Sequence, residues 1–322
     1  MQVNAGGVRR RHPVTRDRGR RRGRGEGDMT IRTILAPVRG AEGAERAMDA
    51  ALAVGRKFGA HVELLHVSGD PRDAIPFVGD AMISADVIDE IVRKVAEDTQ
   101  ARINRARARF DALVGDHAVR RIEARPTRAE AAAGTFSVAW RHLSGREDEV
   151  VSGRGRIFDL IVTDRPMADD DGLPEATLEG ALLGTGRPIF VAPPGGVPSI
   201  GTRVAIAWNG STAAARAVAA AMPFLEQAES THILVGQSPT ARQPLAEDLA
   251  TMLAWHQVKA SVKTFDPGSG HVGNALLAEA HRLHADLLVM GGYGHSHLRE
   301  MIFGGATIDA IFAAELPLLM IH

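Results

Sequence analysis

Residues 33–67 read TILAPVRGAEGAERAMDAALAVGRKFGAHVELLHV, and residues 203–236 read RVAIAWNGSTAAARAVAAAMPFLEQAESTHILVG. Each stretch begins with a short apolar run typical of a buried strand, passes a glycine turn into an alanine-rich amphipathic segment, and ends in a second apolar run. Placing Gly40 on Gly210 sets the two copies 170 residues apart. A repeat at so long a period indicates a duplicated domain and not a solenoid of short units.

The remainder of the chain extends the repeat. FDLIVTDRP at 158–166 matches ADLLVMGGYG at 285–294, and RPIFVAPP at 187–194 matches LPLLMIH at 316–322. In both halves apolar strands alternate with helical segments, which is typical of a parallel sheet covered by helices on both faces. The Pro- and Gly-rich stretch 193–199, PPGGVPS, predicts the linker. We therefore expect one domain over 29–194, the first half, and another over 200–322, the second half.

The same alternation places the expected elements. For the first half we expect strands near 32–38, 62–67, 118–124, 158–163 and 188–192, and helices near 41–58, 82–114, 142–155 and 175–185. For the second half we expect strands near 202–208, 231–236, 259–264, 285–290 and 317–321, and helices near 211–227, 240–256, 270–284 and 305–314. Each half is thus predicted to be an α/β domain with a five-stranded parallel sheet.

Composition excludes several classes of protein. The 322 residues are 45% hydrophobic and 24% charged, as in ordinary globular chains, and they include no cysteine. The lack of cysteine excludes a disulfide scaffold, a thiolate metal site and a cysteine nucleophile, and it fits a reducing compartment, so we expect a cytoplasmic protein. No apolar run approaches the roughly 18 residues that cross a bilayer, so we expect no membrane partner. With only 4% aromatic residues, the chain has few rings to stack on single-stranded nucleic acid.

Residues 1–28 have a different character from the rest. They carry nine arginines against three acidic residues, and they hold almost no large apolar side chains. Such a segment buries too little surface to offset the entropy lost on ordering, so we expect a disordered Arg-rich tail. A nucleic-acid arm or a targeting tail is the alternative interpretation of its charge. We expect no other part of the chain to bind nucleic acid.

The chemistry-bearing stretch follows the fourth strand of the second half, where DLLVM is continued by GGYGHSHLREMIFGGATIDAIF. Gly291 and Gly294 leave the strand, and Gly304 and Gly305 then open the last expected helix. Glycines let backbone N–H groups face an anion without a Cβ in the way, and the start of a helix favours a phosphate. Thr307 is placed to cap that helix or to donate its hydroxyl. We favour a phosphate site over a turn that only reverses the chain.

Glycines spaced as Gly-x2-Gly-x9-Gly after strand four of a five-stranded α/β unit resemble the universal stress protein family. The two halves, about 290 residues together, are similar to a tandem member of that family. The resemblance implies two tandem doubly wound, Rossmann-like domains with strand order 3-2-1-4-5, paired through their fifth strands as a pseudo-dimer. It implies either a monomeric pseudo-dimer or a homodimer, unidentified protein partners, and an adenine nucleotide, ATP with Mg²⁺, at the ends of strands one and four.

The sequence departs from the family pattern at three places. Gly305 stands where nucleotide-binding members carry Ser or Thr, and Asn209, followed by Gly210 and Ser211, stands where they carry Asp. The first half has Arg39 at the corresponding position, and the acidic run 169–171 replaces its glycine loop. Because adjacent carboxylates repel a polyphosphate, we expect a degenerate site there and one nucleotide per chain. The residues expected to bind it are Asn209, Gly210, Val235 through its backbone, Gly291, Gly294, His295 as a donor, Gly304, Gly305 and Thr307.

Three functions remain open: a nucleotide-binding stress-response module, an interaction scaffold whose sites have decayed, and an adenine-nucleotide hydrolase. The hydrolase is disfavoured because no general base accompanies the glycine loop and the strand-one acid is absent. Ser296 lacks the Gly-x-Ser-x-Gly elbow of a hydrolase nucleophile. We expect no metal site, because nothing completes a ligand set with His295 and His297 or with His281 and His284.

Overall fold

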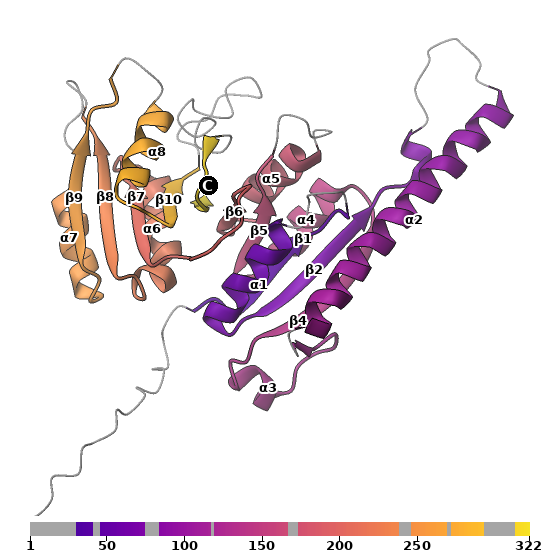
Figure 1. Cartoon of the computed structure of the whole chain (residues 1–322), viewed down its shortest axis with the longest axis horizontal. Coiled ribbons are helices and arrows are strands. Elements are labelled where there is room, and N and C mark those ends of the chain that lie inside the picture. Colours follow the sequence, from indigo (N-terminus) through magenta and orange to yellow (C-terminus); the bar gives the residue numbers. More distant parts are fainter. Residues whose placement is uncertain are drawn as a thin grey trace, which may run out of the picture.

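The computed structural model describes residues 30–40, 46–74, 84–116, 119–166, 173–237, 246–268, 272–292 and 313–322. These residues form one sheet of eleven strands flanked by helices, with the first half at one end and the second half at the other (Figure 1). Among the described residues, no helix combines the length and apolar character that a membrane span requires.

The elements of the first half are β1 (Thr33–Pro37), α1 (Arg46–Phe58), β2 (His61–Ser68), the short 3-10 helix η1 (Pro71–Ala74), α2 (Ala85–Asp116), β3 (Arg120–Arg121), α3 (Arg128–Ala132), β4 (Ser137–Ser144), α4 (Glu147–Gly155), β5 (Leu160–Asp164), α5 (Leu173–Gly184) and β6 (Ile189–Ala192). Those of the second half are β7 (Arg203–Ala207), α6 (Thr212–Leu225), β8 (Ser230–Gly236), α7 (Ala246–Trp255), β9 (Ala260–Phe265), α8 (Val272–Arg282), β10 (Leu287–Gly291) and β11 (Leu318–Ile321).

The strand order confirms the predicted fold class. The sheet runs β3-β4-β2-β1-β5-β6-β11-β10-β7-β8-β9, so each half has the order 3-2-1-4-5 once the edge strand β3 is set aside. Neighbouring strands are parallel within each half, whereas β6 and β11 pair antiparallel, with Phe190 opposite Leu319. The two fifth strands therefore join the halves, and their apolar edges are covered as expected.

The first half contains one strand more than predicted. The expected third strand, near 118–124, is reduced to the two exposed residues of β3 at the sheet edge. The strand beside β2 is β4. The prediction of a helix over 142–155 is wrong at its start, because β4 continues to Ser144 and the helix α4 begins only at Glu147. β4 buries Ser137, Val138 and Ala139, whereas Arg120 and Arg121 are exposed, so β4 is the strand that fits beside β2.

The duplication extends to individual side chains. The carboxylate of Asp159, just before β5, accepts hydrogen bonds from the backbone N–H groups of Arg32 and Thr33, both at 2.9 Å. Asp286, just before β10, accepts the same bonds from Thr202 at 3.1 Å and Arg203 at 2.8 Å. In each half one carboxylate therefore fixes the start of strand one against the start of strand four.

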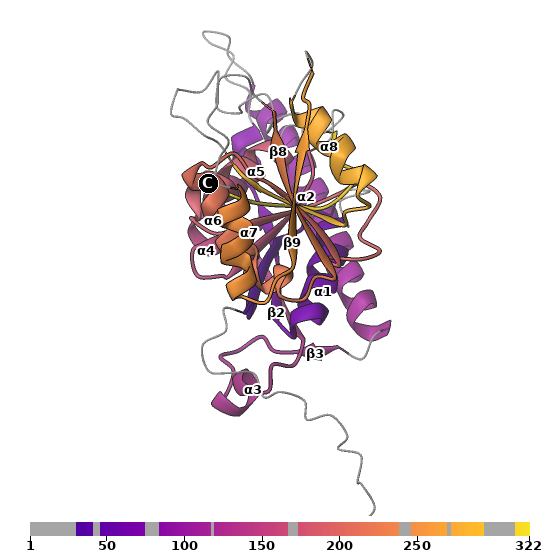
Figure 2. The same cartoon turned by 90° about the vertical axis from the view of Figure 1, so that its left-hand side faces the viewer.

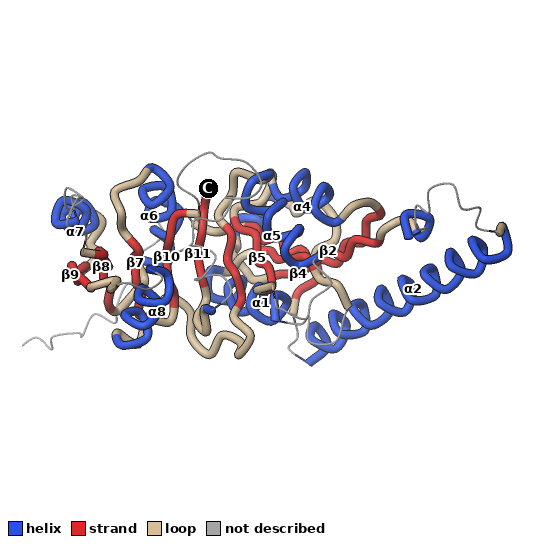
Figure 3. Tube along the Cα trace, turned by 90° about the horizontal axis from the view of Figure 1, so that it is seen from above, coloured by secondary structure: helices blue, strands red, loops and turns tan. Residues whose placement is uncertain are grey.

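Helices cover both faces of the sheet, and the strands form a row between them (Figure 3). The apolar side chains of α1, α2, α6 and α7 belong to one core layer, and those of α4, α5 and α8 belong to the other. The strands fan out when the sheet is viewed end-on (Figure 2), as the usual strand twist requires. Phe224 of α6 bridges the halves, because its ring lies 4.8 Å from that of Phe58 in α1 and 6.4 Å from that of Phe190 in β6.

Candidate functional site

The strand ends of the second half bring three of the expected site residues together. β7 and β10 are paired, with Ile206 opposite Val289, so both strands end at the same edge of the sheet. Asn209 and Gly210 follow β7 after one intervening residue, and Gly291 is the last residue of β10. In an open α/β sheet, this edge between strands one and four is where ligands bind.

A tight turn holds Asn209 in place. Its Oδ1 accepts a hydrogen bond from the backbone N–H of Ser211 at 3.0 Å, and Gly210 between them has φ +72°. Ser211 then caps α6, since its Oγ accepts the N–H of Ala214 at 3.1 Å. The side-chain amide NH₂ of Asn209 is left as a donor for a ligand.

Gly291 lies against the first turn of α6 at a distance that only glycine allows. A Cβ at this position would lie 2.7 Å from the carbonyl carbon of Ala213 and from the backbone nitrogen of Ala214. Any other residue would push β10 away from α6. The packing of β10 against α6 therefore explains why the first residue of the motif is glycine, which the spacing of the motif alone does not explain.

The structure gives less information about the other residues expected at the site. Val235 is buried in β8, opposite Thr264 of β9, and its predicted contact with adenine stays a prediction. The remaining site residues, Gly294, His295, Gly304, Gly305 and Thr307, lie outside the described residues, as do Ser296, His297 and the acidic run 169–171. Among the described residues there is no group of three His, Cys, Asp or Glu that could hold a metal ion.

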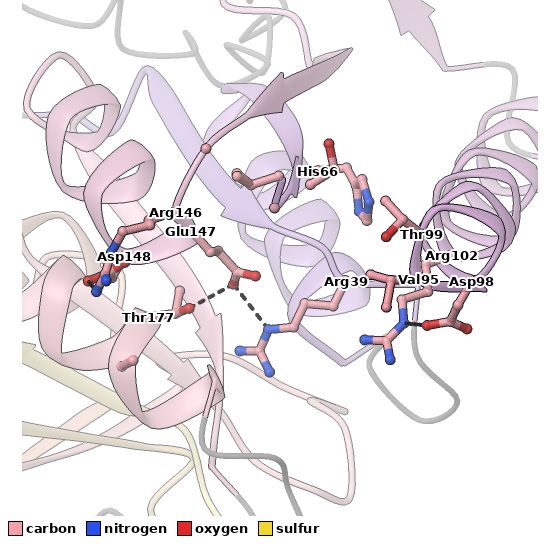
Figure 4. Close-up of a pocket in the computed structure, with 15 residues that line it drawn as sticks. Arg39, His66, Val95, Asp98, Thr99, Arg102, Arg146, Glu147, Asp148 and Thr177 are labelled. Atoms are coloured by element: carbon pink, nitrogen blue, oxygen red, sulfur yellow. Dashed lines mark hydrogen bonds and ion pairs between the residues drawn. The ribbon is translucent and has the colours of Figure 1, made fainter. Parts of the chain in front are cut away.

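The corresponding strand ends of the first half enclose a pocket of about 680 Å³ (Figure 4). The sequence predicts a degenerate site in this half, and Arg39 is the one lining residue at a position that the motif comparison singles out. The lining comes from the end of β1, the end of β2, the middle of α2, the start of α4 and the start of α5. His66 at the end of β2 was the one available signal, and it lay outside any motif.

Arg39 is held by an internal network. Its Nε donates a hydrogen bond to Oε1 of Glu147 at 3.0 Å, and the Thr177 hydroxyl donates to the same oxygen at 2.7 Å (Figure 4). Thr177 is buried, and Arg39 and Glu147 are mostly shielded from solvent. The arginine that replaces the strand-one acid therefore ties β1 to the starts of α4 and α5.

Asp164 occupies in the first half the place that Gly291 has in the second. Leu160 of β5 pairs with Ile34, and Leu287 of β10 pairs with Val204 in the same way. Asp164 comes four residues after Leu160, and Gly291 comes four residues after Leu287. The buried Asp164 carboxylate accepts the backbone N–H of Ala47 in α1 at 2.7 Å. In the second half the strand end thus packs directly against the first helix, whereas in the first half a carboxylate side chain joins the two through a hydrogen bond.

Comparisons with known proteins agree with this architecture. Residues 202–322 match the sequence model of the universal stress protein family. Comparison with curated protein sequences gives no match. A universal stress protein from Archaeoglobus fulgidus DSM 4304 is similar over 91% of this chain and 96% of its own, with a TM-score of 0.61 and 14% identity.

Two further solved structures are similar at a lower level. A putative universal stress protein from Pseudomonas aeruginosa UCBPP-PA14 is similar over 90% of this chain and 93% of its own, with a TM-score of 0.49 and 12% identity. A universal stress protein in complex with cAMP is similar over 51% and 97%, with a TM-score of 0.28 and 12% identity. At these identities the likeness concerns the fold, which the Archaeoglobus protein shares over nearly the whole chain.

Proposed function

We propose that this chain, whose residues 202–322 match the sequence model of the universal stress protein family, is a stress-response module that binds one adenine nucleotide, ATP in the first instance, in its second half. The observation that carries the proposal is the approach of Gly291 to α6, where a Cβ would lie 2.7 Å from backbone atoms. That approach places the beginning of the glycine motif beside the Asn209 turn, at the sheet edge where ligands bind.

The residues present suit a nucleotide. The motif glycines after Gly291 would leave backbone N–H groups accessible to phosphate oxygens, because they carry no side chain to block the approach. Asn209 would donate to a ribose hydroxyl or to a phosphate, and Gly294, Gly304, Gly305 and Thr307 would surround the phosphates. Mg²⁺ would be bound through the phosphates of the nucleotide.

The two departures from the family motif predict weak affinity. Asn209 replaces an acid and Gly305 replaces a hydroxyl residue, and each loses one hydrogen bond involving a charged group. Such bonds contribute about 1.5–3 kcal/mol each, so each loss weakens binding by roughly tenfold or more.

Calorimetric titration of the full chain with Mg-ATP tests the proposal. We expect one site per chain and loss of binding in Gly294→Val, whose side chain would fill the space for phosphate. Gly195→Val is the matched control, because a Cβ at Gly195 meets no atom within 4 Å. A second variant, Asn209→Asp, retains the acceptor for Ser211 and should tighten binding roughly tenfold if the side chain contacts ribose.

Other outcomes point to other functions. Two sites per chain, or unchanged binding in Gly294→Val, would contradict the assignment to the second half. No binding at millimolar ATP would favour the interaction scaffold, and steady release of phosphate would favour the hydrolase.

A further inference from the structure

The pocket of the first half combines features that suit a ligand of another kind. Its mouth lies at the ends of β1 and β2, between α2 on one face and the starts of α4 and α5 on the other (Figure 4). At about 680 Å³ it falls within the range of small-molecule sites. Val67, Val95 and Ala176 contribute apolar surface to its lining.

The charges that line this pocket are paired with one another. Arg39 pairs with Glu147 at 3.0 Å, Arg102 with Asp98 at 2.8 Å, and Arg146 with Asp148 at 3.1 Å. Each cation thus already faces a carboxylate. A polyphosphate here would have to displace those carboxylates or lie beside them, and both are unfavourable. The lining therefore favours an uncharged ligand.

His66 supplies the pocket with one hydrogen-bond acceptor. The side chain is only 3% exposed, and its Nδ1 lies 2.7 Å from the carbonyl oxygen of Val38. A carbonyl can only accept, so Nδ1 carries the proton and Nε2 is the bare acceptor of a neutral ring. Among the described residues, no group donates to Nε2. Burial lowers the pKa of His66, which keeps the ring neutral at physiological pH.

We propose that this pocket is a second ligand site, which takes an uncharged heteroaromatic molecule whose ring N–H donates a hydrogen bond to Nε2 of His66. The flat apolar body of the ligand would lie against Val67, Val95 and Ala176. Nε2 belongs to a residue that lines the pocket, so a ligand that supplies a donor gains affinity from that bond. The site is separate from the nucleotide site of the second half, and neither proposal depends on the other.

A pair of probes that differ only in the donor tests this. Benzimidazole carries a ring N–H, and 1-methylbenzimidazole has a methyl group in its place. Trp140 reports on the pocket, because its ring is stacked on that of His66 with centroids 6.2 Å apart. We expect benzimidazole, titrated into the full chain at pH 7.5, to shift the Trp140 indole N–H resonance saturably with one site. The methylated probe should bind at least tenfold more weakly, roughly the effect of one buried hydrogen bond.

Two variants locate the site. His66→Asn keeps an N–H donor for the Val38 carbonyl, and its shorter side chain leaves no acceptor at the position of Nε2, so benzimidazole should bind it no better than the methylated probe binds the parent. His61→Asn is the matched control on the same strand, because His61 bonds Ser137 at the opposite end of β2 and should leave binding unchanged. Ala176→Leu fills the pocket while leaving His66 in place, and should abolish binding of both probes.

Each comparison can overturn the proposal. Equal affinity for the two probes would show that no donor is recognised, and absence of a saturable shift at millimolar benzimidazole would show that the pocket is not a site. Unchanged binding in Ala176→Leu would place the probe elsewhere, even if His66→Asn failed to fold. Gly294→Val should bind benzimidazole normally, so this test and the nucleotide test fail independently.

Discussion

Glu63 is the most deeply buried carboxylate that the structure pairs with arginine. It lies in β2, is 4% exposed, and accepts hydrogen bonds from Arg154 of α4, while Arg141 of β4 is 3.7 Å away. The bond to Glu63 raises the pKa of Arg154. The pair holds α4 against the sheet, and through α4 it supports the wall of the first-half pocket.

Glu63→Gln should destabilise the chain. Removing one member of a buried ion pair costs about 3–5 kcal/mol, and because Arg154 keeps a quarter of its surface exposed we expect the lower figure of about 1–3 kcal/mol. Urea unfolding measures the loss. The control is Glu97→Gln, whose partner Arg93 and own side chain are both highly exposed, and which should change stability by less than about 0.5 kcal/mol. Equal effects of the two variants would contradict the role given to Glu63.

Three histidines that are at least partly buried should make stability depend on pH. Burial lowers the pKa of His61, His66 and His232 below the usual 6.5. The folded state therefore binds fewer protons than the unfolded state, so the free energy of unfolding rises with pH through this range. The corresponding stability is lost as the pH falls from about 6.5 toward the folded pKa values. Urea unfolding at pH 7.5 and 5.5 should show lower stability at pH 5.5. His66→Asn should reduce that difference, and an unchanged slope would refute its contribution.

Among the secondary-structure elements, β1 and β7 each begin at backbone N–H groups bound by a carboxylate, Asp159 in the first half and Asp286 in the second. Each carboxylate binds two backbone N–H groups of the strand-one start in its own half. Asp159→Ala and Asp286→Ala should each lower the free energy of unfolding by about 1–3 kcal/mol, since the N–H groups lose a charged acceptor. Chemical denaturation of both variants checks this. If only one of the two variants lost stability, the two carboxylates would not contribute equally to the free energy of unfolding.

Most of the secondary structure could be predicted because the strands of a parallel sheet are continuous apolar runs. β4 could not, because its sequence SVAWRHLS mixes buried and exposed positions and runs directly into α4. The Val and Ile of 118–124 suggested a strand there, yet β3 has only two residues. Which of the two segments lies beside β2 depends on tertiary packing, and local pattern does not encode it.

The candidate site of the second half could be predicted as far as a continuous motif reaches. Asn209 and Gly210 lie just after β7 and Gly291 ends β10, and the apolar pattern predicts both strands. The first-half pocket could not be predicted, because its network joins residues such as Arg39 and Glu147 that are 108 positions apart. Nothing in the sequence around His66 indicates that its Nδ1 would bond the Val38 carbonyl and that its ring would line a pocket.

At the scale of the whole molecule, Phe224 couples the halves. Its ring is fully buried and contacts Phe58 and Phe190 of the other half. Phe224→Ala should cost about 3–5 kcal/mol and lower a single calorimetric transition, because both halves lose packing. Met252→Ala, at a partly exposed position of α7, is the control and should leave the transition nearly unchanged. Two separate transitions, only one of which moves, would show that the halves unfold independently.

The antiparallel pairing of β6 with β11 reverses the direction of every strand from one half to the other. The carboxyl ends of β1 and β5 therefore open at one long edge of the sheet, and those of β7 and β10 open at the opposite edge. Two molecules bound there would never compete for space, and no one loop could close over both. Any linkage between their occupancies would have to pass through the contacts between the halves, such as the β6–β11 pair and the contact of Phe224 with Phe58, so the chain would bind two ligands on opposite sides and couple them through its core.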